Sequence, residues 1–278
     1  MNLFNLKNEL QSVMNTYACT ITPEMKLLRV LASNHARKQS QKEGKSYSIF
    51  DLDEGGITVY ASAYEKRLSE PIVDLERMDN RDKIHKLTHP NDLPGTIENE
   101  LRGFYALQQL HLEEKENFKL IYLRRLKNKS EGYQLYLHKV SVLECDINGM
   151  PWLLEIVTEQ ISDCIKDLNR ISEFYLLFPL PIPNRKKREV FVNNTWLTEQ
   201  ELNILQLVSE GKNQLIIADI LHVSVNTVKT HYNTIRKKLN IKTIQMAANF
   251  AKLTGILMHL LLIWTKWGEE INDFISGS

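Results

Sequence analysis

Residues 224–239 read SVNTVKTHYNTIRKKL. Ser224 suits the start of a helix, because its hydroxyl accepts a hydrogen bond from a free N–H group of the first turn. Apolar side chains then recur at spacings of four, three and four positions, which is the pattern of one helix face. They are Val228, Tyr232, Ile235 and Leu239. The stretch therefore predicts an amphipathic α-helix.

The opposite face of this predicted helix carries hydrogen-bonding and cationic side chains and no carboxylate. They are Asn226, Lys229, Thr230, Asn233, Arg236 and Lys237. In the DNA major groove, lysine can donate to guanine, asparagine can bind adenine, and threonine can contact a thymine methyl group. The pattern thus favours a helix that recognises DNA. A solvated surface helix is the alternative, although such helices usually mix both signs of charge.

Two shorter helices are predicted upstream of this one. Thr198 and Glu201 have the spacing of a capping box, and the helix that they open ends at Gly211. A second helix is expected at residues 213–221, followed by a two-residue turn. Two short helices, a tight turn and a polar-faced helix together predict a helix-turn-helix.

Residues 196–256 closely resemble the LuxR-type, or GerE-type, four-helix DNA-binding domain. The residues that match are Leu197, Thr198, Glu201, Leu205, Gly211, Ile217, Ala218, Leu221, Ser224, Thr227, Val228, Lys229, Thr230, His231, Lys238 and Leu239. In that family a fourth helix, expected here from about residue 243, often forms the dimer contact. The chain departs from the family at Ile216, where an acid is usual, and at Ile244, where an arginine is frequent.

The resemblance implies that seven polar residues contribute to a DNA interface. Those expected to face base edges are Lys229, Thr230 and Asn233. Those expected to meet phosphates are Asn213, Thr227, Arg236 and Lys237. The predicted DNA-binding set is completed by Ser224 and Asn226.

The charge of the chain is concentrated in its C-terminal part. Residues 185–256 hold 11 Lys and Arg against 5 Asp and Glu, whereas residues 1–184 hold 23 against 26. Only the C-terminal part is therefore expected to meet a polyanion. The length of 278 residues allows about two domains. Three widely spaced cysteines argue against a disulfide framework or a zinc cluster, and no apolar run is long enough to span a membrane.

Residues 1–160 predict helices followed by a sheet. Two helices are expected in residues 1–45, the second opened by Thr22 and Pro23. Strands are expected at residues 47–52, 57–62, 118–127, 133–144 and 152–159, and a long helix at residues 93–114. The predicted class is α+β, with a five-stranded antiparallel sheet and helices on one side of it, followed by the all-α helix-turn-helix domain.

Residues 46–160 resemble a PAS sensory domain. The resemblance rests on Phe50, Asp51, Gly56, Val59, Tyr60, Ser62, His89, Pro90, Asp92, Leu93, Asp146 and Gly149, and on the run of residues 132–157. That family commonly holds a small ligand between sheet and helices, or dimerises through the outer sheet face. His85, His89 and His111 invite a haem assignment, but a lone histidine is more often a surface or capping residue. No cofactor is predicted.

Residues 161–195 are expected to connect the two domains. A helix is predicted to continue through residues 174–178, after which three prolines stiffen the chain. The basic run at residues 184–188 is either solvated or a contact to the DNA backbone. Residues 257–278 predict an apolar helical extension that must be buried, in a dimer seam or under the sensory domain. A helix at the membrane interface is the alternative, which the lone Lys266 disfavours.

No phosphate-binding glycine loop, GxSxG elbow or HExxH motif occurs, so no enzyme is predicted. An enzyme acting in the PAS-like pocket would require turnover of a bound small molecule. The sequence predicts a cytoplasmic bacterial transcription regulator that binds double-stranded DNA as a homodimer, with no membrane partner. Its PAS-like domain would sense a signal, such as a small-molecule ligand, and control how two helix-turn-helix units are presented. The alternative is a protein-interaction module whose helix-turn-helix no longer binds DNA.

Overall fold

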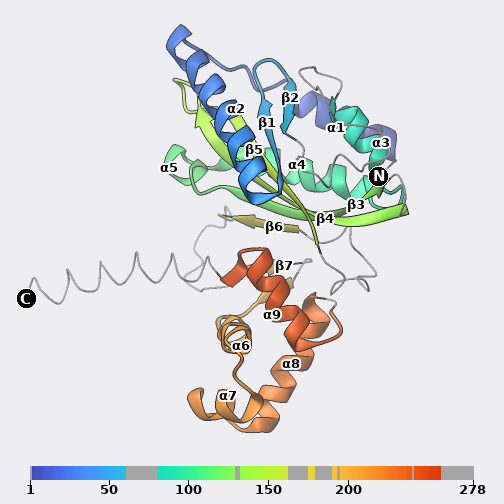
Figure 1. Cartoon of the computed structure of the whole chain (residues 1–278), viewed down its shortest axis with the longest axis vertical. Coiled ribbons are helices and arrows are strands. Elements are labelled where there is room, and N and C mark those ends of the chain that lie inside the picture. The colour runs from blue at the N-terminus through green and yellow to red at the C-terminus, as the bar shows by residue number, and fades with distance from the viewer. Residues whose placement is uncertain are drawn as a thin grey trace, which may run out of the picture. The chain divides into compact units, whose positions relative to one another are not determined.

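A computed structural model describes residues 2–60, 80–128, 132–161, 175–178, 190–192, 195–239 and 241–257. The described elements divide into two compact units (Figure 1). An N-terminal unit mixes helices with a sheet and ends at Phe178, and a C-terminal unit, mainly helical, begins at Val190.

The N-terminal unit is built on one antiparallel sheet. Its strands are β1 (Ser46–Asp51), β2 (Gly56–Tyr60), β3 (Lys119–Asn128), β4 (Gly132–Cys145), β5 (Pro151–Gln160) and β6 (Tyr175–Phe178). Its helices are α1 (Leu3–Met14), α2 (Pro23–Glu43), α3 (Asn80–Leu87), α4 (Leu93–Gln109) and α5 (Leu112–Lys115). The strand order is β2-β1-β5-β4-β3-β6. Strands occur at all five predicted places, but the sheet has six strands, so the predicted number is wrong.

The extra strand is β6, which sequence reasoning assigned to the end of a helix. Tyr175 pairs with Tyr122 and Phe178 pairs with Lys119, antiparallel to β3. Aromatic residues favour strands, but the preference is weak and depends on a neighbour to pair with. That neighbour is an edge strand distant in sequence, whose free backbone N–H and C=O groups need partners. The local pattern therefore could not reveal β6.

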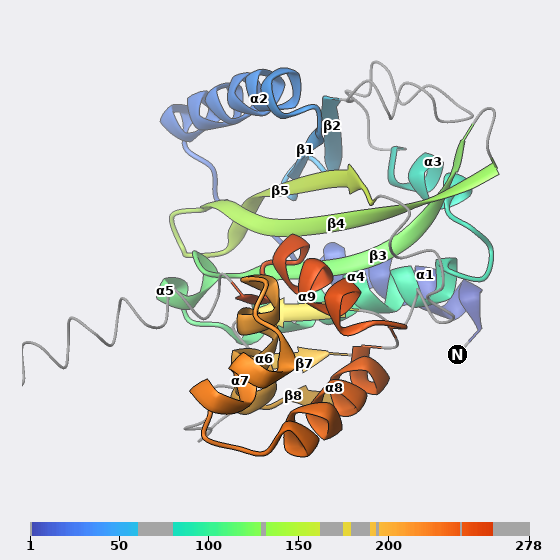
Figure 2. The ribbon, with the colours of Figure 1, turned by 60° about the horizontal axis from the view of Figure 1, so that its bottom comes forward.

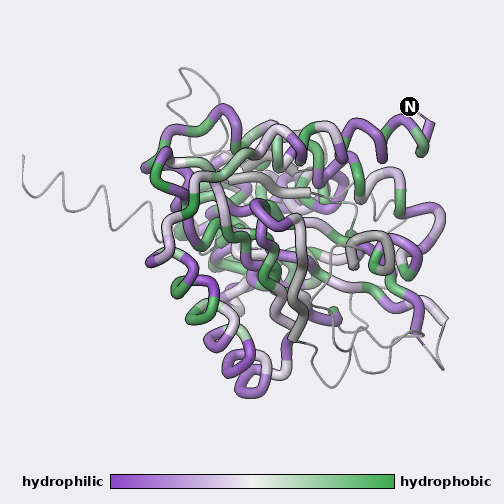
Figure 3. The backbone as a smooth tube through the Cα atoms, turned by 90° about the horizontal axis from the view of Figure 1, so that it is seen from above, coloured by the Kyte–Doolittle hydropathy of each residue, from purple (hydrophilic) through white to green (hydrophobic). Residues whose placement is uncertain are grey.

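Helices cover both faces of this sheet (Figure 2). On one face, Ala36 of α2 is buried against Ile49 of β1 and Trp152 of β5, and Met25, Leu28 and Ala32 pack around them. On the other face lies α4, which packs with α1. The prediction of helices on one side was made for the sheet of residues 46–160, and within that range α3 and α4 lie on the same face. The second face is covered by α2, which belongs to residues 1–45 and has an inward apolar stripe of its own. Figure 3 shows hydrophilic and hydrophobic stretches alternating along the helices, as expected of elements that bury one side.

A buried carboxylate fixes the start of α4 against the sheet. Asp92 is 2% exposed, and its Oδ2 accepts hydrogen bonds from both the backbone N and the Nε of Arg125, each at 2.9 Å. Its Oδ1 accepts a third from Arg125 Nη2 at 2.6 Å. Charge-assisted bonds of this geometry are strong and directional. They anchor the end of α4 from which the helix runs across the sheet.

The C-terminal unit contains the predicted helix-turn-helix (Figure 1). Its elements are β7 (Val190–Val192), β8 (Thr195–Leu197), α6 (Glu199–Ser209), α7 (Gln214–Ile220), α8 (Val225–Leu239) and α9 (Ile244–Leu253). The four helices are confirmed, whereas the β7–β8 hairpin was not predicted. Fully buried apolar side chains from all four helices form one core: Leu202, Leu205, Ile217, Val228, Ile235, Leu239, Ala247 and Phe250.

Several predictions concern residues outside the described ranges. They are the connecting helix before residue 175, the proline-rich and basic stretches at residues 179–188, and the apolar extension beyond residue 257. Among the helices that the structure describes, none is both long enough and apolar enough to cross a membrane.

Candidate nucleic-acid interface and interior cavity

Side-chain hydrogen bonds shape the start of α8, with the cap supplied by Ser224 just before the helix. Ser224 Oγ accepts a hydrogen bond from the backbone N–H of Thr227 at 3.0 Å, as predicted. Thr230 Oγ1 donates to the carbonyl of Asn226 at 3.0 Å. His222, in the turn before α8, has φ +52°, a left-handed conformation that non-glycine residues seldom adopt. The turn and the cap together set the direction in which α8 leaves α7.

One face of α8 is open to solvent and carries most of the predicted interface. Its exposed side chains are Asn226, Lys229, Thr230, Asn233, Arg236 and Lys237. Among the residues that the structure describes, no carboxylate forms an ion pair with Lys229, Arg236 or Lys237. A solvated helix of ordinary composition would offset these cations with acids. The face is therefore a continuous donor-rich surface with an uncompensated positive charge.

The other three predicted residues flank this face or support it. Ser224 is exposed and caps α8, and Thr227 is half-buried in the first turn. Asn213 is exposed and caps α7, since its Oδ1 accepts from the N–H groups of Leu215 and Ile216 at 2.9 and 3.1 Å.

A buried acid attaches α8 to α6. Glu201, with a side chain 3% exposed, accepts from Lys238 Nζ at 2.8 Å. The same oxygen accepts from the backbone N–H of Thr198 at 2.8 Å, so the predicted capping box is confirmed and extended to α8. Sequence reasoning matched Glu201 and Lys238 to a family but did not pair them. The position of Glu201 could have indicated that it needs a partner. It lies directly beside the buried Leu202 and one turn from the buried Leu205.

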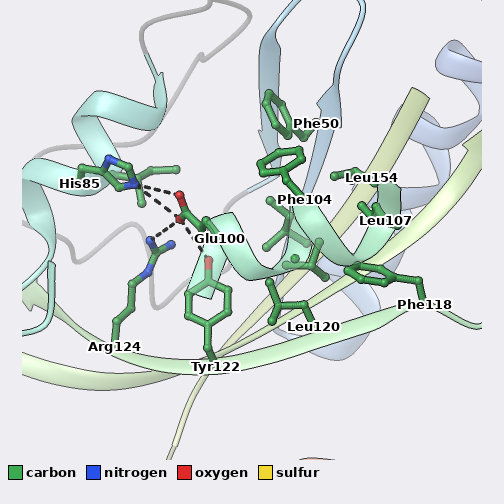
Figure 4. A pocket seen from close by; sticks show the side chains of 14 residues that line it. Phe50, His85, Glu100, Phe104, Leu107, Phe118, Leu120, Tyr122, Arg124 and Leu154 are labelled. Carbon is green, nitrogen blue, oxygen red and sulfur yellow. Dashed lines mark hydrogen bonds and ion pairs between the residues drawn. The ribbon is translucent and has the colours of Figure 1, made fainter. Parts of the chain in front are cut away.

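The N-terminal unit contains a cavity of about 70 Å³ that is lined by α3, α4 and strands β1, β3, β4 and β5. Most of its wall is apolar and includes Phe50, Phe104, Leu107, Phe118, Leu120 and Leu154 (Figure 4). Gly103 of α4 also lines it. A Cβ atom at Gly103 would lie 2.8 Å from Leu120 Cδ2, so glycine allows α4 to approach β3 this closely.

Polar side chains gather around Glu100 at one end of the cavity (Figure 4). His85 Nε2 lies 3.2 Å from Glu100 Oε2, and the Tyr122 hydroxyl donates to Oε1 at 3.4 Å. Arg124 Nη1 is 3.9 Å from the same oxygen. The side chains of His85, Arg124 and Glu100 are 2%, 6% and 16% exposed. An apolar chamber with a charged, hydrogen-bonding end is typical of small-molecule sites.

A second layer holds Arg124 in place. Arg124 Nε donates to His138 Nε2 at 2.8 Å, so the imidazole proton sits on Nδ1, which lies 2.9 Å from Thr158 Oγ1. The His138 ring stacks on Tyr122, with centroids 5.2 Å apart. Burial and then the charge of Arg124 hold the pKa of His138 well below its ordinary value. His138 therefore stays neutral and serves as an acceptor.

Sequence reasoning missed this polar cluster, apart from weighing His85 as a haem ligand. Two patterns could have found it. Tyr122 and Arg124 alternate with apolar positions on a strand, which puts them on one face. Glu100 and Leu107 are two helical turns apart, which puts them on one face of α4.

The described cysteines carry thiols that are weak nucleophiles, and the described residues of metal-binding types do not gather into a metal site. Cys19 and Cys145 are free. Burial, followed by the nearby Asp146, raises the pKa of Cys19 to about 12, and burial also raises the pKa of Cys145. Both thiols are therefore protonated at neutral pH and weakly nucleophilic. Within the described ranges, no group of three or more His, Cys, Asp or Glu is placed to hold a metal ion.

Comparison with known proteins gives the same picture for the C-terminal unit. Residues 195–251 match the family model of bacterial regulatory proteins of the luxR family. The uncharacterised response regulatory protein YgeK of Escherichia coli K12 is 30% identical over 107 residues, covering 38% of this chain and 70% of that protein. The response regulator VraR of Staphylococcus saprophyticus is 26% identical over 208 residues, covering 73% and 94%.

Among solved structures, a dimer of Vibrio cholerae VqmA in the absence of its target DNA is 15% identical. The match covers 79% of this chain and 87% of that one, with a TM-score of 0.31. A score of this size does not establish a shared overall arrangement.

Proposed function

The chain belongs to the luxR family of bacterial regulatory proteins, and we propose that it controls transcription as a signal-dependent dimer that binds specific DNA sequences. The observation that carries this proposal is the exposed, carboxylate-free face of α8 within the domain that matches the family. A helix of this kind fits the major groove, where its side chains reach base edges. The proposed place of action is the bacterial cytoplasm.

Within this proposal, different residues of the α8 face contact the bases and the phosphates. Lys229, Thr230 and Asn233, in the middle of the exposed face, read base edges. Asn226 lies beside them. Contacts to the phosphate backbone come from Arg236 and Lys237 in the last turns of α8, and from Asn213, Ser224 and Thr227 near the ends of α7 and α8. The division is supported by the positive charges of Lys229, Arg236 and Lys237, because none of the described carboxylates would have to be displaced when DNA binds.

Residues 46–160 of the N-terminal unit are the proposed PAS-like sensor. The cavity between α4 and the sheet supports this role, because it combines an apolar wall with a polar end. A signal can act only through a difference in its affinity for two arrangements of the protein. We therefore expect that ligand binding in the cavity favours one arrangement of the two helix-turn-helix domains in the dimer over another.

The proposed dimer uses the outward face of α2. Leu27, Val30 and Leu31 recur at spacings of three and one positions and are 61%, 52% and 55% exposed, although the opposite side of α2 is packed on the sheet. A second copy of the chain offers the same stripe, which makes the contact self-complementary under twofold symmetry. A symmetric dimer would match two half-sites about one helical turn of DNA apart.

A salt titration of binding to duplex DNA tests the proposed function. Full-length protein should bind random duplex at low salt, and its affinity should fall steeply as salt rises, because phosphate contacts release counterions. A selected operator should bind at least about a thousandfold more tightly at physiological salt. Absence of binding to any duplex at low salt would contradict the proposal.

One observation favours a second function, that of a protein-interaction module. Leu215, Ile216 and Ile220 of α7 are 64%, 44% and 45% exposed, which is unusual for three neighbouring branched apolar residues. Such a surface suits a protein partner better than a phosphate backbone. The same titration separates the two functions, since an interaction module would bind no DNA at low salt.

A further inference from the structure

The threonine hydroxyl groups of α8 are bound within the protein, which limits what they can offer to a base pair. Thr230 Oγ1 donates to the carbonyl of Asn226 at 3.0 Å, and Thr234 Oγ1 donates to the carbonyl of Thr230 at 3.1 Å. Ser224 Oγ and Thr227 Oγ1 share a hydrogen bond of 2.9 Å. Each threonine of the helix, and the serine before it, therefore has a hydrogen-bond partner for its hydroxyl group.

Thr230 is the threonine of α8 that lies open on the proposed groove face. It is exposed, whereas Thr227 and Thr234 are half-buried. Its neighbours along the face are Asn226, one turn before it, and Asn233, three positions after it. Its hydroxyl hydrogen is used in the bond to Asn226. Thr230 therefore has no proton to donate to an acceptor of guanine, adenine or thymine unless that bond breaks.

The γ-methyl group is the part of Thr230 that remains for contact with a base. The bond from the hydroxyl to the backbone fixes the χ1 angle of this β-branched side chain, so the methyl group has one position before DNA binds. A group that is already ordered loses little further conformational entropy on binding. Its apolar complement in the major groove is the C5-methyl group of thymine, which the other three bases lack.

We propose that Thr230 recognises the C5-methyl group of a thymine through its own methyl group, and that this contact selects a thymine·adenine pair in each half-site. The inference rests on the proposed function, in which α8 enters the major groove. 5-Methylcytosine carries a methyl group at the same position of the pyrimidine ring. The contact therefore also makes binding sensitive to methylation of a cytosine placed there.

A hydrogen bond accepted by the hydroxyl oxygen of Thr230 is the rival contact. An oxygen that donates its hydrogen can still accept, and the bases that donate in the major groove are adenine and cytosine. Valine at this position keeps the methyl group and removes the oxygen, whereas serine keeps the oxygen and removes the methyl group. These two substitutions separate the contacts without a change of charge.

Replacement of single methyl groups in DNA tests the proposal on the unaltered chain. Full-length protein would select duplexes from a random library at physiological salt. Each thymine of a selected duplex would then be replaced in turn by deoxyuridine, which lacks only the C5-methyl group, and affinity measured by fluorescence anisotropy. We expect a thymine in each half-site whose replacement lowers affinity about fourfold, the effect of burying one methyl group. At that position 5-methylcytosine should bind about fourfold more tightly than cytosine.

Variants of the two back-bonded threonines assign the contact to Thr230. Thr230→Val should retain the roughly fourfold preference for thymine over deoxyuridine, and Thr230→Ser should lose it. Thr234→Ser is the matched control, because Thr234 makes the same bond one turn later but is half-buried, and it should retain the preference. Retention of the preference by Thr230→Ser, or its loss in Thr230→Val, would overturn the proposal. If a variant does not fold, the deoxyuridine scan of the unaltered chain still decides, since insensitivity at every thymine excludes the contact.

The same measurements distinguish failure of this inference from failure of the proposed function. Salt-dependent binding of a selected duplex, with no loss of affinity at any deoxyuridine, would leave the regulator intact and overturn the methyl contact. Absence of binding to any duplex, even at low salt, would instead overturn the proposed function and the methyl contact together.

Discussion

At the scale of single residues, the proposed DNA complex uses two kinds of contact from α8 that differ in what they contribute. Asparagine and lysine near the middle of the exposed face would form hydrogen bonds that depend on the base, whereas cations near its end would meet phosphates that are the same in every sequence. Specificity and affinity should therefore respond to different substitutions, even though all these side chains lie on one helix face.

Substitutions on α8 should separate these effects. Lys229→Ala and Asn233→Ala should each cost about 1–3 kcal/mol on the operator and relax its specificity. Arg236→Ala should weaken all sequences alike and reduce the slope of log affinity against log salt by about one. Binding would be measured by fluorescence anisotropy over a range of salt, with Asn203→Ala, exposed on α6, as the control. Unchanged operator affinity in Lys229→Ala would refute the groove assignment.

His138 should make the stability of the N-terminal unit depend on pH. Its folded pKa lies well below the ordinary value of about 6.5, because burial and Arg124 oppose its charge. Below pH ~6.5, His138 is protonated in the unfolded chain but stays neutral in the folded chain. The free energy of unfolding therefore falls by up to about 1.4 kcal/mol for each unit by which the pH is lowered. Above pH ~7 His138 contributes no pH dependence.

Thermal unfolding between pH 5 and 8 measures this effect. His138→Asn should flatten the curve between about pH 5 and 6.5, a window above the range in which ordinary carboxylates titrate. Lys139 and Lys45, despite burial, hold the pKa of Glu159 below its ordinary value, so its contribution is lost only at lower pH. His35→Asn, on the exposed side of α2, is the matched control and should keep the slope. The same slope in His138→Asn would show that another group is responsible.

At the scale of secondary-structure elements, the orientation of α8 depends on an ion pair as well as on the apolar core. Glu201 is the N3 residue of α6 and accepts from Thr198 and from Lys238 with one oxygen. The capping box and the α6–α8 contact thus depend on the same carboxylate oxygen. Removing the acid leaves the Thr198 N–H group uncapped and removes the bond between Glu201 and Lys238.

A double-mutant cycle should reveal this coupling. Glu201→Gln should destabilise the C-terminal unit by about 1–3 kcal/mol, because it removes bonds to a charged group from a buried site. Lys238 is 21% exposed, so Lys238→Met should cost less. The double variant should be more stable than the sum of the two changes implies, as measured by urea unfolding. Strict additivity would mean that the pair does not hold α8.

At the scale of the whole molecule, the proposed regulator must bring two helix-turn-helix domains to one operator. The outward stripe of α2, the proposed dimer contact, lies in the same unit as the cavity, so in this proposal ligand binding and dimer geometry share one framework. Such coupling requires only that the two states of the dimer differ in ligand affinity.

Placing a charge in the α2 stripe should weaken the dimer. Leu31→Lys should raise the dimer dissociation constant about tenfold or more, since burying an unpaired ammonium is costly. Analytical ultracentrifugation would measure it. Leu112→Lys is the matched control, because Leu112 is 54% exposed and Leu31 is 55% exposed, but Leu112 lies on α5. A monomeric unaltered chain, or equal effects of the two variants, would rule out this seam.

The sequence by itself determined the elements whose signals are local. The capping residues Thr22, Thr198 and Ser224, and the apolar spacing of Val228, Ile235 and Leu239, predicted helices that the structure confirms. Turn glycines and strand alternation likewise placed five strands. These signals lie within a few residues of one another, because hydrogen bonds at a helix end and side-chain periodicity act over one or two turns. The exposed face of α8 followed from the same pattern.

Only the tertiary structure decided what depends on residues distant in sequence. It decided that α2 covers the second face of the sheet, that β6 joins its edge, and that Glu201 meets Lys238. It also brought Glu100 and Arg124, 24 positions apart, to the end of one cavity. No local pattern specifies such pairings, because their free energy comes from burial and from partners that exist only after the chain has folded.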